Sequence, residues 1–281
     1  KNKALNFKIY NLINKTVVNT VYATFELMKK KLTIICLLFS FSIIGQNKPM
    51  ELYQTGNSNF KSGNYEKAIE NYTELMNIVD DKMVQKTGYI NRGLSYDRLQ
   101  KYDLAIADFT EAIKLDSTDM ASFIDRGLSK MRAGYLEQAK VDYNYVVYKN
   151  NNPKMMEAAL YWLARIHYSQ GEFKETIKNC DRYFIINPTD PELYFIRGTA
   201  NDMLGNFEQS IVDYGKAIEI KPNYVQAIAN RGTAKINLLT ARGNLQPSKK
   251  ETKEACKDLK EAKKLGDKSV EDLIFIYCDR K

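Results

Sequence analysis

Small and apolar residues recur along the chain at a spacing close to 34 residues. Within a unit, a small residue is followed twelve positions later by a second small residue, and a bulky residue stands four positions further on. Gly127, Ala139 and Tyr143 are one such set, and a short turn such as Leu204-Gly205-Asn206-Phe207 lies between the two small positions. Apolar residues at helical spacing on both sides of a turn predict antiparallel helix pairs, repeated along the chain.

Six such units cover most of the chain, over about 49–82, 86–119, 120–153, 157–190, 191–224 and 225–267. The fullest set lies in the fifth unit: Tyr194, Arg197, Gly198, Gly205, Phe207, Ser210, Tyr214, Ala217 and Pro222. This set resembles the tetratricopeptide repeat. The resemblance implies an all-α fold, a right-handed superhelical α-solenoid of helix-turn-helix repeats. We expect the small residues to let the two helices of a unit approach closely, and the aromatic residues to fill the space toward the next unit.

Two units depart from the pattern. In the sixth, Gly232 and Ala255 are 23 residues apart instead of 12, so we expect the extra residues in the inter-helix turn and the second helix over 253–265. The fourth unit has Ala164, Thr176 and Cys180 where others have glycine, alanine and an aromatic residue. After the sixth unit, apolar residues at helical spacing predict a capping helix over 269–279 that covers the last open face.

The first 45 residues differ from the rest. Met28 is followed by three lysines and the apolar run Leu32–Ile44, which indicates a signal peptide over 28–45. The alternative, a membrane span, is disfavoured because 13 helical residues cover about 20 Å of a bilayer core about 30 Å thick. Residues 1–27 are interpreted as an upstream extension outside the fold, or alternatively as a real polar extension. We therefore expect an exported protein, periplasmic or secreted, with its repeat domain over 46–281 and membrane contact only through an uncleaved signal segment.

The net charge of +8 lies mainly in this leader, where residues 1–45 carry +6, so the repeat domain offers no case for a nucleic-acid partner. The sequence shows no nucleotide-binding loop, no metal-spaced cysteine pair and no nucleophile elbow, so we expect no catalytic residue, metal or cofactor. The single histidine, His167, is interpreted as a packed helix residue, with a catalytic base as the alternative.

Arginine and aspartate occur together within a unit. Four units have arginine directly before the landmark glycine and aspartate sixteen or more residues later: Arg92 and Asp108, Arg126 and Asp142, Arg197 and Asp213, and Arg231 and Asp258. The first and fourth units lack the arginine and carry asparagine instead of the aspartate. This predicts a structural ion pair between the two helices of a unit, the alternative being that the arginines bind a ligand. Replacing Asp108 by alanine is then expected to lower the thermal midpoint.

The family resemblance implies that the first helix of each unit lines a groove that binds a partner protein or peptide. Projecting first-helix positions inward gives a candidate groove formed by Arg132, Tyr161, Trp162, Arg165, Tyr168, Phe195 and Asp202. Packing between units is the alternative for its apolar members. The groove differs from the carboxylate clamp that grips chaperone C-termini, because Tyr53, Ala121 and Asp125 stand where that clamp has cations.

Cys256 of the sixth unit and Cys278 of the capping helix are candidates for a disulfide. Cys256 precedes Gly266 by ten residues and Cys278 follows it by twelve, so the two reach similar heights in an antiparallel hairpin. A bond also requires that both helices turn their cysteines toward each other, which the spacing does not decide, so two unpaired thiols are the alternative. Cys180, at a core position, is expected to be a buried free thiol.

Taken together, these features favour a non-enzymatic scaffold or adaptor that binds a partner polypeptide in the bacterial envelope. An accessory subunit of an envelope assembly or secretion complex is the alternative. An enzyme acting on cell-wall polymers is a third reading, and an acidic cleft with a shifted carboxylate pKa would favour it.

Overall fold

The computed structural model describes residues 48–149 and 152–279, and all regular elements in these ranges are helices. The chain divides into two compact units, Lys1–Ser95 and Tyr96–Lys281, and the division falls inside helix α3. The expected upstream extension and signal peptide, residues 1–45, lie outside the described residues. None of the described helices is long and apolar enough to cross a bilayer.

The first unit holds a helix over residues 48–61, then α2 (Tyr65–Ile78) and most of α3 (Lys82–Arg98). Helix α3 begins at Lys82, four residues before the start predicted for the second repeat. The carboxylate of Asp81 accepts hydrogen bonds from the backbone N–H groups of Met83 and Val84, which stabilises this extra turn.

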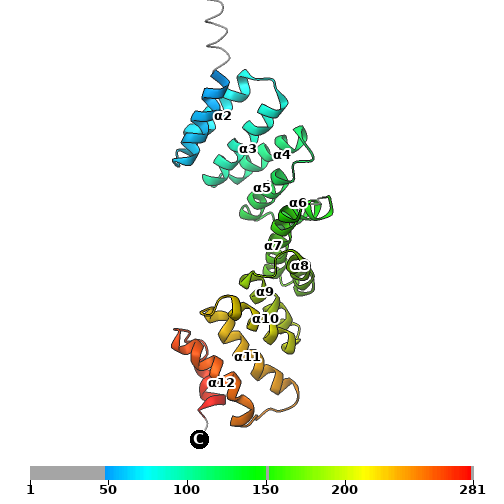
Figure 1. Cartoon of the computed structure of the whole chain (residues 1–281), viewed down its shortest axis with the longest axis vertical. Coiled ribbons are helices and arrows are strands. Elements are labelled where there is room, and N and C mark those ends of the chain that lie inside the picture. The colour runs from blue at the N-terminus through cyan, green and yellow to red at the C-terminus, as the bar shows by residue number, and fades with distance from the viewer. Residues whose placement is uncertain (1–47, 150–151, 280–281) are drawn as a thin grey trace, which may run out of the picture. The chain divides into compact units, whose positions relative to one another are not determined.

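The second unit continues as alternating helices that pair in sequence (Figure 1). Each helix from α4 to α12 packs against the next one, and α5, α7, α9 and α11 also contact one another. We call the surface of α5, α7, α9 and α11 the first-helix face. The bounds are α4 (Tyr102–Leu115), α5 (Met120–Arg132), α6 (Leu136–Lys149), α7 (Pro153–Ser169), α8 (Phe173–Ile186), α9 (Pro191–Met203), α10 (Phe207–Ile220), α11 (Val225–Ala241) and α12 (Lys249–Lys264).

Glycine lets the two helices of a repeat cross closely. A Cβ added at Gly127 would lie 2.9 Å from ring atoms of Tyr143 on the paired helix, and Gly198 meets Tyr214 in the same way at 3.0 Å. Both tyrosines are fully buried. The aromatic ring therefore fills the space left by the glycine of its own repeat, whereas the sequence had placed it toward the next unit.

Two boundaries differ from the sequence expectation. Helix α7 begins at Pro153, which had been assigned to the third unit, because the side chain of Asn152 caps the helix and proline is well tolerated at its first position. In the sixth unit the extra residues mostly lengthen the helices: α11 has 17 residues against 13 in α9, and α12 begins at Lys249 behind a capping box of Ser248 and Glu251. The turn over 242–248 is still longer than the turn over 204–206 in the fifth repeat, but it takes only part of the extra residues.

The C-terminal segment forms a short cap on α12. Helix α13 (Glu271–Leu273) continues into a π-helical turn, η1 (Ile274–Cys278), which packs against α12 (Figure 1). Val270 and Ile274 are buried there with Leu259 and Ala262 of α12. A capping helix is thus present, although most of it is π-helical.

Candidate functional site

Three predicted arginine–aspartate pairs join the two helices of their repeats. The guanidinium of Arg197 donates twice to the carboxylate of Asp213, at 3.1 and 2.6 Å, and the pairs Arg126–Asp142 and Arg231–Asp258 have the same bidentate form. The three aspartates are at most 5% exposed. Because both oxygens of each buried carboxylate are taken by the chain's own donors, these pairs hold the fold together. Arg92 and Asp108 belong to one repeat, but the division between the two compact units falls between them, so their pairing stays a prediction.

Each of these aspartates has a further hydrogen-bond donor that was not predicted from the sequence. The residue four positions after the arginine also donates to the same carboxylate: Lys130 to Asp142 at 2.8 Å, Asn201 to Asp213 at 3.1 Å and Lys235 to Asp258 at 2.7 Å. Residues four apart share a helix face, so the spacing itself was the available signal.

A polar and aromatic cluster joins α7 to α9 on the first-helix face. The Tyr161 hydroxyl donates to Glu192 at 2.9 Å, and the Arg165 guanidinium donates to the Tyr161 oxygen and pairs with Glu192. The Arg165 charge also lies 5.5 Å from the ring centroids of both Tyr161 and Trp162. All four side chains are partly exposed, so the cluster is part of the surface.

The other predicted groove residues are spread over neighbouring repeats. Arg132 of α5 pairs with the buried carboxylate of Asp97. Phe195 packs against Tyr214 and Tyr224, and Tyr168 borders the core, so both have a packing role as well. The structure therefore brings together Tyr161, Trp162 and Arg165, but places Arg132 and Asp202 on separate helices of the same face.

A hollow of about 570 Å³ opens beside this cluster. It is lined by Lys154, Glu157, Ala158, Tyr161, Trp162, Tyr183 and Asp190. The Tyr183 hydroxyl lies 3.2 Å from the Glu157 carboxylate and 3.3 Å from that of Asp190. The hollow thus combines aromatic walls with two carboxylates and one lysine.

Two further carboxylates of the first-helix face sit in unusual surroundings. Burial, with the negative charges of Asp119 and Asp97, raises the pKa of Asp125 to about 6. Burial also raises the pKa of Asp202, against a hydrogen bond from Asn237, and its Oδ1 atom is buried without a donor. The sequence predicted that both Asp202 and Asp125 line the groove, and Asp125 is also unsuited to the carboxylate clamp.

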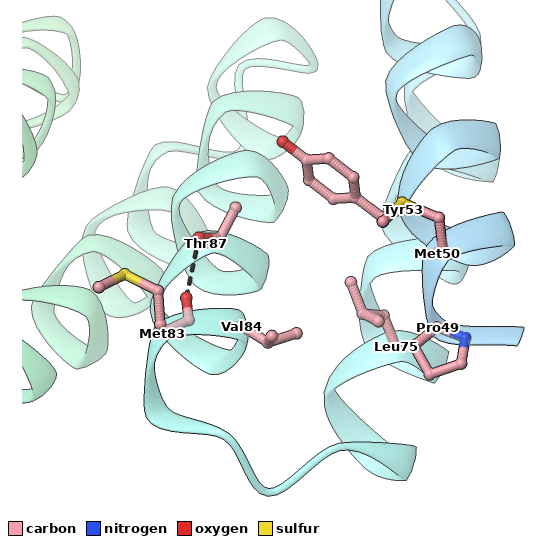
Figure 2. Close-up of a pocket in the computed structure, with 7 residues that line it drawn as sticks. All are labelled: Pro49, Met50, Tyr53, Leu75, Met83, Val84 and Thr87. Atoms are coloured by element: carbon pink, nitrogen blue, oxygen red, sulfur yellow. Dashed lines mark hydrogen bonds between the residues drawn. The ribbon is translucent and has the colours of Figure 1, made fainter. Parts of the chain in front are cut away.

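The first compact unit, which ends at Ser95, has an apolar hollow of about 270 Å³ that was not predicted from the sequence. Figure 2 shows Pro49, Met50 and Tyr53 of the helix over 48–61 on one side and Val84 and Thr87 of α3 on the other, with Leu75 of α2 between them. Met83 lines the hollow as well, although its side chain extends away from the helix over 48–61. Met50 and Met83 are 58% and 63% exposed. Exposed methionines at the starts of two successive first helices were the available sequence signal, and the hollow suits an aliphatic or aromatic side chain.

Two other side chains that could carry chemistry, His167 and Cys180, are engaged by a neighbouring side chain or buried in the core. His167 lies at the end of α7 and contacts the carboxylate of Glu172 across the turn. Cys180 is a buried free thiol, as expected, and burial raises its pKa to about 12, which disfavours the reactive thiolate. Within residues 48–149 and 152–279, no group of three His, Cys, Asp or Glu side chains is placed to hold a metal ion.

The structure joins Cys256 of α12 to Cys278 of η1 by a disulfide, with their Cα atoms 5.5 Å apart. The bond closes a loop whose ends are 22 residues apart and fastens the cap to the last repeat.

Models of the tetratricopeptide repeat match residues 87–119 and 191–224. Protein unc-45 homolog B of Xenopus laevis is 33% identical over 94 residues, which are 34% of this chain and 10% of that protein. DnaJ homolog subfamily C member 7 of Homo sapiens is 38% identical over 94 residues, 33% of this chain and 19% of that protein. The matches thus span between a tenth and a fifth of these relatives.

Solved structures match over more of the chain. The C-terminal part of a TPR repeat-containing protein from Cytophaga hutchinsonii has a TM-score of 0.58 at 22% identity, covering 82% of this chain and 96% of its own. YrrB, described as a TPR protein with an unusual peptide-binding site, has a TM-score of 0.57 at 18% identity, covering 72% and 96%. At these identities the likeness concerns the fold.

Proposed function

Because the chain is built from tetratricopeptide repeats, we propose that it is a non-catalytic scaffold that binds a partner polypeptide on its first-helix face. Tetratricopeptide proteins act as protein–protein interaction scaffolds, and the neighbour YrrB is described as having a peptide-binding site. The observation that carries the proposal is the cluster of Tyr161, Trp162 and Arg165 beside an open hollow. Tyrosine, tryptophan and arginine are the residue types that dominate binding energy at protein interfaces.

We propose further that the protein works outside the cytoplasm, in the periplasm or beyond it. The signal-peptide pattern over 28–45 supports this, and so does the Cys256–Cys278 disulfide, since such bonds persist mainly in oxidising compartments. In that location the scaffold would serve an envelope assembly or secretion complex as an accessory subunit.

A tryptophan-based assay tests the scaffold proposal. Trp162 is the only tryptophan in the chain, so its fluorescence reports on the first-helix face directly. A partner captured from envelope extract by the mature protein should shift this emission, and Arg165→Ala should weaken binding by about tenfold or more without unfolding the repeats.

The exposed Arg182 on α8 supplies the matched control, because it is the same residue type on a second helix. Arg182→Ala should leave the affinity unchanged. If Arg182→Ala abolishes binding while Arg165→Ala does not, the partner binds the second-helix side and the proposed site is wrong.

The enzyme alternative has one observation in its favour, the raised pKa of Asp125, since a carboxyl group of this kind suits a general acid. Its acidic neighbours are already engaged: Asp119 accepts from Ser122 at 2.7 Å, and Asp97 accepts from Ser129 at 2.8 Å and pairs with Arg132. This favours binding over catalysis. Release of soluble fragments from peptidoglycan by the wild type, and none by Asp125→Asn, would instead support the enzyme.

A further inference from the structure

Helix α12 has more lysines than the other second helices. Seven of its 16 residues are lysine, against one or two in each of α4, α6, α8 and α10. Three of the seven have ion-pair partners: Lys260, Lys263 and Lys264. The other four are exposed and have no ion pair within residues 48–149 and 152–279, and we call them the lysine row: Lys249, Lys250, Lys253 and Lys257. A strip of positive charge without a protein partner therefore runs along this helix.

The lysine row occupies one side of α12. At about 100° per residue, its four members fall within a sector about 100° wide. The four acidic residues of the helix lie outside that sector: Glu251, Glu254, Asp258 and Glu261. Asp258 among them is buried in its pair with Arg231. The charge of the row is thus not neutralised by carboxylates of its own helix.

The C-terminal cap adds an exposed aromatic ring. Glu271 and Asp279 of the cap pair with Lys263 and Lys260 of α12, at 3.2 and 2.9 Å. Phe275 stands four residues after Glu271 and four before Asp279, so it lies on the edge of the cap that borders this side of α12. Its side chain is 78% exposed, although η1 packs against the last repeat.

Phe275 and the lysine row belong to one surface. Lys257 stands three residues before Lys260, which holds the edge of the cap, so the row lies next to that edge. The disulfide between Cys256 and Cys278 fastens the cap to the same helix. The exposed ring is therefore kept beside ammonium groups that have no ion-pair partner in the described chain.

This combination suits the boundary between water and a bilayer. An aromatic ring enters the region between lipid headgroups and acyl chains, while lysines beside it attract anionic headgroups and keep their ammonium groups in water. A folded protein partner would have to offer a pocket shaped for Phe275, whereas a bilayer takes up an exposed ring without one. The chemistry of the surface thus favours a membrane over a protein.

We propose that Phe275 and the lysine row dock the protein on a bilayer that contains anionic phospholipid. This inference goes beyond the scaffold function, because it uses residues other than the cluster of Tyr161, Trp162 and Arg165. It also adds a membrane contact to the one expected from the sequence, an uncleaved signal segment. The low net charge of the repeat domain as a whole hides this local surface.

The experiment measures binding to lipid vesicles by sedimentation. It uses protein that begins at Gln46, the proposed mature form, because the apolar run Leu32–Ile44 would bind lipid by itself. Vesicles of equal parts phosphatidylglycerol and phosphatidylcholine are compared with vesicles of phosphatidylcholine alone. We expect binding at least about tenfold tighter to the anionic vesicles, and added salt should reduce it because salt screens the lysine charges.

A double substitution tests the lysine row. Lys253→Gln with Lys257→Gln should weaken binding to the anionic vesicles by about tenfold or more, because a lysine near such a surface contributes a factor of about five. Lys67→Gln with Lys174→Gln makes the same change in net charge at exposed lysines of α2 and α8. This control should leave binding nearly unchanged.

A single substitution tests the aromatic ring. Phe275→Ser should weaken binding to the anionic vesicles by about threefold to tenfold, because the ring no longer enters the bilayer. Ile185→Ser is the control, since Ile185 is an apolar residue of α8 that is 85% exposed, and it should have no effect. Unchanged thermal midpoints would show that the variants keep the fold.

Several results would overturn the membrane proposal. These are equal binding to the two kinds of vesicle, binding to neither, and equal losses in a test variant and its control. Tighter binding to soluble polyglutamate than to the anionic vesicles, with no effect of Phe275→Ser, would show that the partner is an acidic polypeptide instead. The scaffold proposal fails separately, because Arg165→Ala should leave vesicle binding unchanged.

Discussion

At Gly127 a hydrogen atom stands where any other residue would place a carbon 2.9 Å from the ring of Tyr143. The ring is fully buried between two helices and has little room to move. We expect Gly127→Ala to destabilise the protein by about 1–3 kcal/mol through overpacking, measured as a lower midpoint of thermal or urea unfolding.

The control for this substitution is Gly215→Ala. Gly215 is also inside a helix, but a Cβ there would meet only Arg231 at 3.9 Å, an ordinary contact. Alanine should therefore be neutral or stabilise the protein by up to about 1 kcal/mol, because it favours the helix. Equal destabilisation by both substitutions would contradict the close packing inferred at Gly127.

Asp213 shows the value of a filled acceptor. It is fully buried and receives donors from Arg197 and Asn201. Asp213→Ala would leave Arg197 partly buried without its main partner, and we expect a loss of about 3–5 kcal/mol. Asp181 is the other partner of Arg197, and its side chain is 55% exposed. Asp181→Ala should therefore lower the free energy of unfolding by at most about 1 kcal/mol. Similar losses for the two variants would show that burial does not set the strength of the pair.

Asp125, unlike Asp213, has no hydrogen-bond donor among the described residues, and its contribution to the free energy of unfolding should depend on pH. Its pKa is raised to about 6 in the folded state, from an ordinary value of 3.8, by burial and by Asp119 and Asp97. Between these two pH values the folded state binds more protons than the unfolded state, so this group makes the protein more stable as the pH falls from 6 toward 4.

The Asp125→Asn variant should lack this contribution and be more stable than the wild type at pH 7. Unfolding midpoints measured from about pH 4 to 8 check this, because the difference between the two proteins should shrink as the wild type takes up its proton. Parallel curves would mean that Asp125 is not desolvated.

At the scale of elements, local caps decide where helices begin. Asp190 accepts from the backbone N–H groups of Glu192 and Leu193, and Ser248 with Glu251 forms a capping box, so α9 and α12 start at defined residues. The same effect extends α3 and α7 by a turn beyond the repeat pattern. Helix ends therefore follow side-chain caps more closely than the 34-residue period.

The C-terminal cap depends on the disulfide. Reducing the bond, or replacing Cys278 by serine, should destabilise the protein by about 3 kcal/mol, with the loss of order concentrated in η1 and the end of α12. Hydrogen exchange of these segments with and without reductant measures this. Thiol counting on denatured, unreduced mature protein should find one thiol, that of Cys180, and a count of three would contradict the disulfide.

At the scale of the whole molecule, the contacts that stabilise the repeats and the residues proposed to bind a partner lie in different places. The buried ion pairs and the glycine–aromatic contacts join the two helices of a repeat, while the cluster of Tyr161, Trp162 and Arg165 lies on the first-helix face. Such an arrangement leaves the stability of each repeat independent of the partner. Substitution of a partly exposed residue of the first-helix face such as Arg165 should thus change binding with little effect on folding.

Export is the other property of the whole chain that can be tested. If residues 28–45 act as a signal peptide, the mature protein should begin near Gln46, because Gly45 is the small residue directly after the apolar run. Intact-mass measurement of protein recovered from the periplasm or medium decides this. A mass that includes Lys29, Lys30 and Lys31 would rule out cleavage at this point.

The sequence by itself determined the repeat length, the helix pairs and the residues of the arginine–aspartate pattern. These follow from the sequence because each depends on residues within one repeat, so the same spacing returns every 34 residues and becomes visible as a period. Two residues that meet inside a repeat, such as Arg197 and Asp213, stand in the same places in the other repeats that carry them.

The tertiary structure decided which polar groups have partners and which do not. The donor that satisfies Asp97 comes from Ser129, 32 residues away, and Glu192 meets Arg165 from 27 residues away, whereas Asp125 meets no donor within residues 48–149 and 152–279. Such contacts join different repeats, so they leave no mark in the spacing of residues within one repeat. The free acceptors on the first-helix face, and the hollows beside them, exist only once neighbouring repeats are packed, because burial is a property of the stack and not of any single helix.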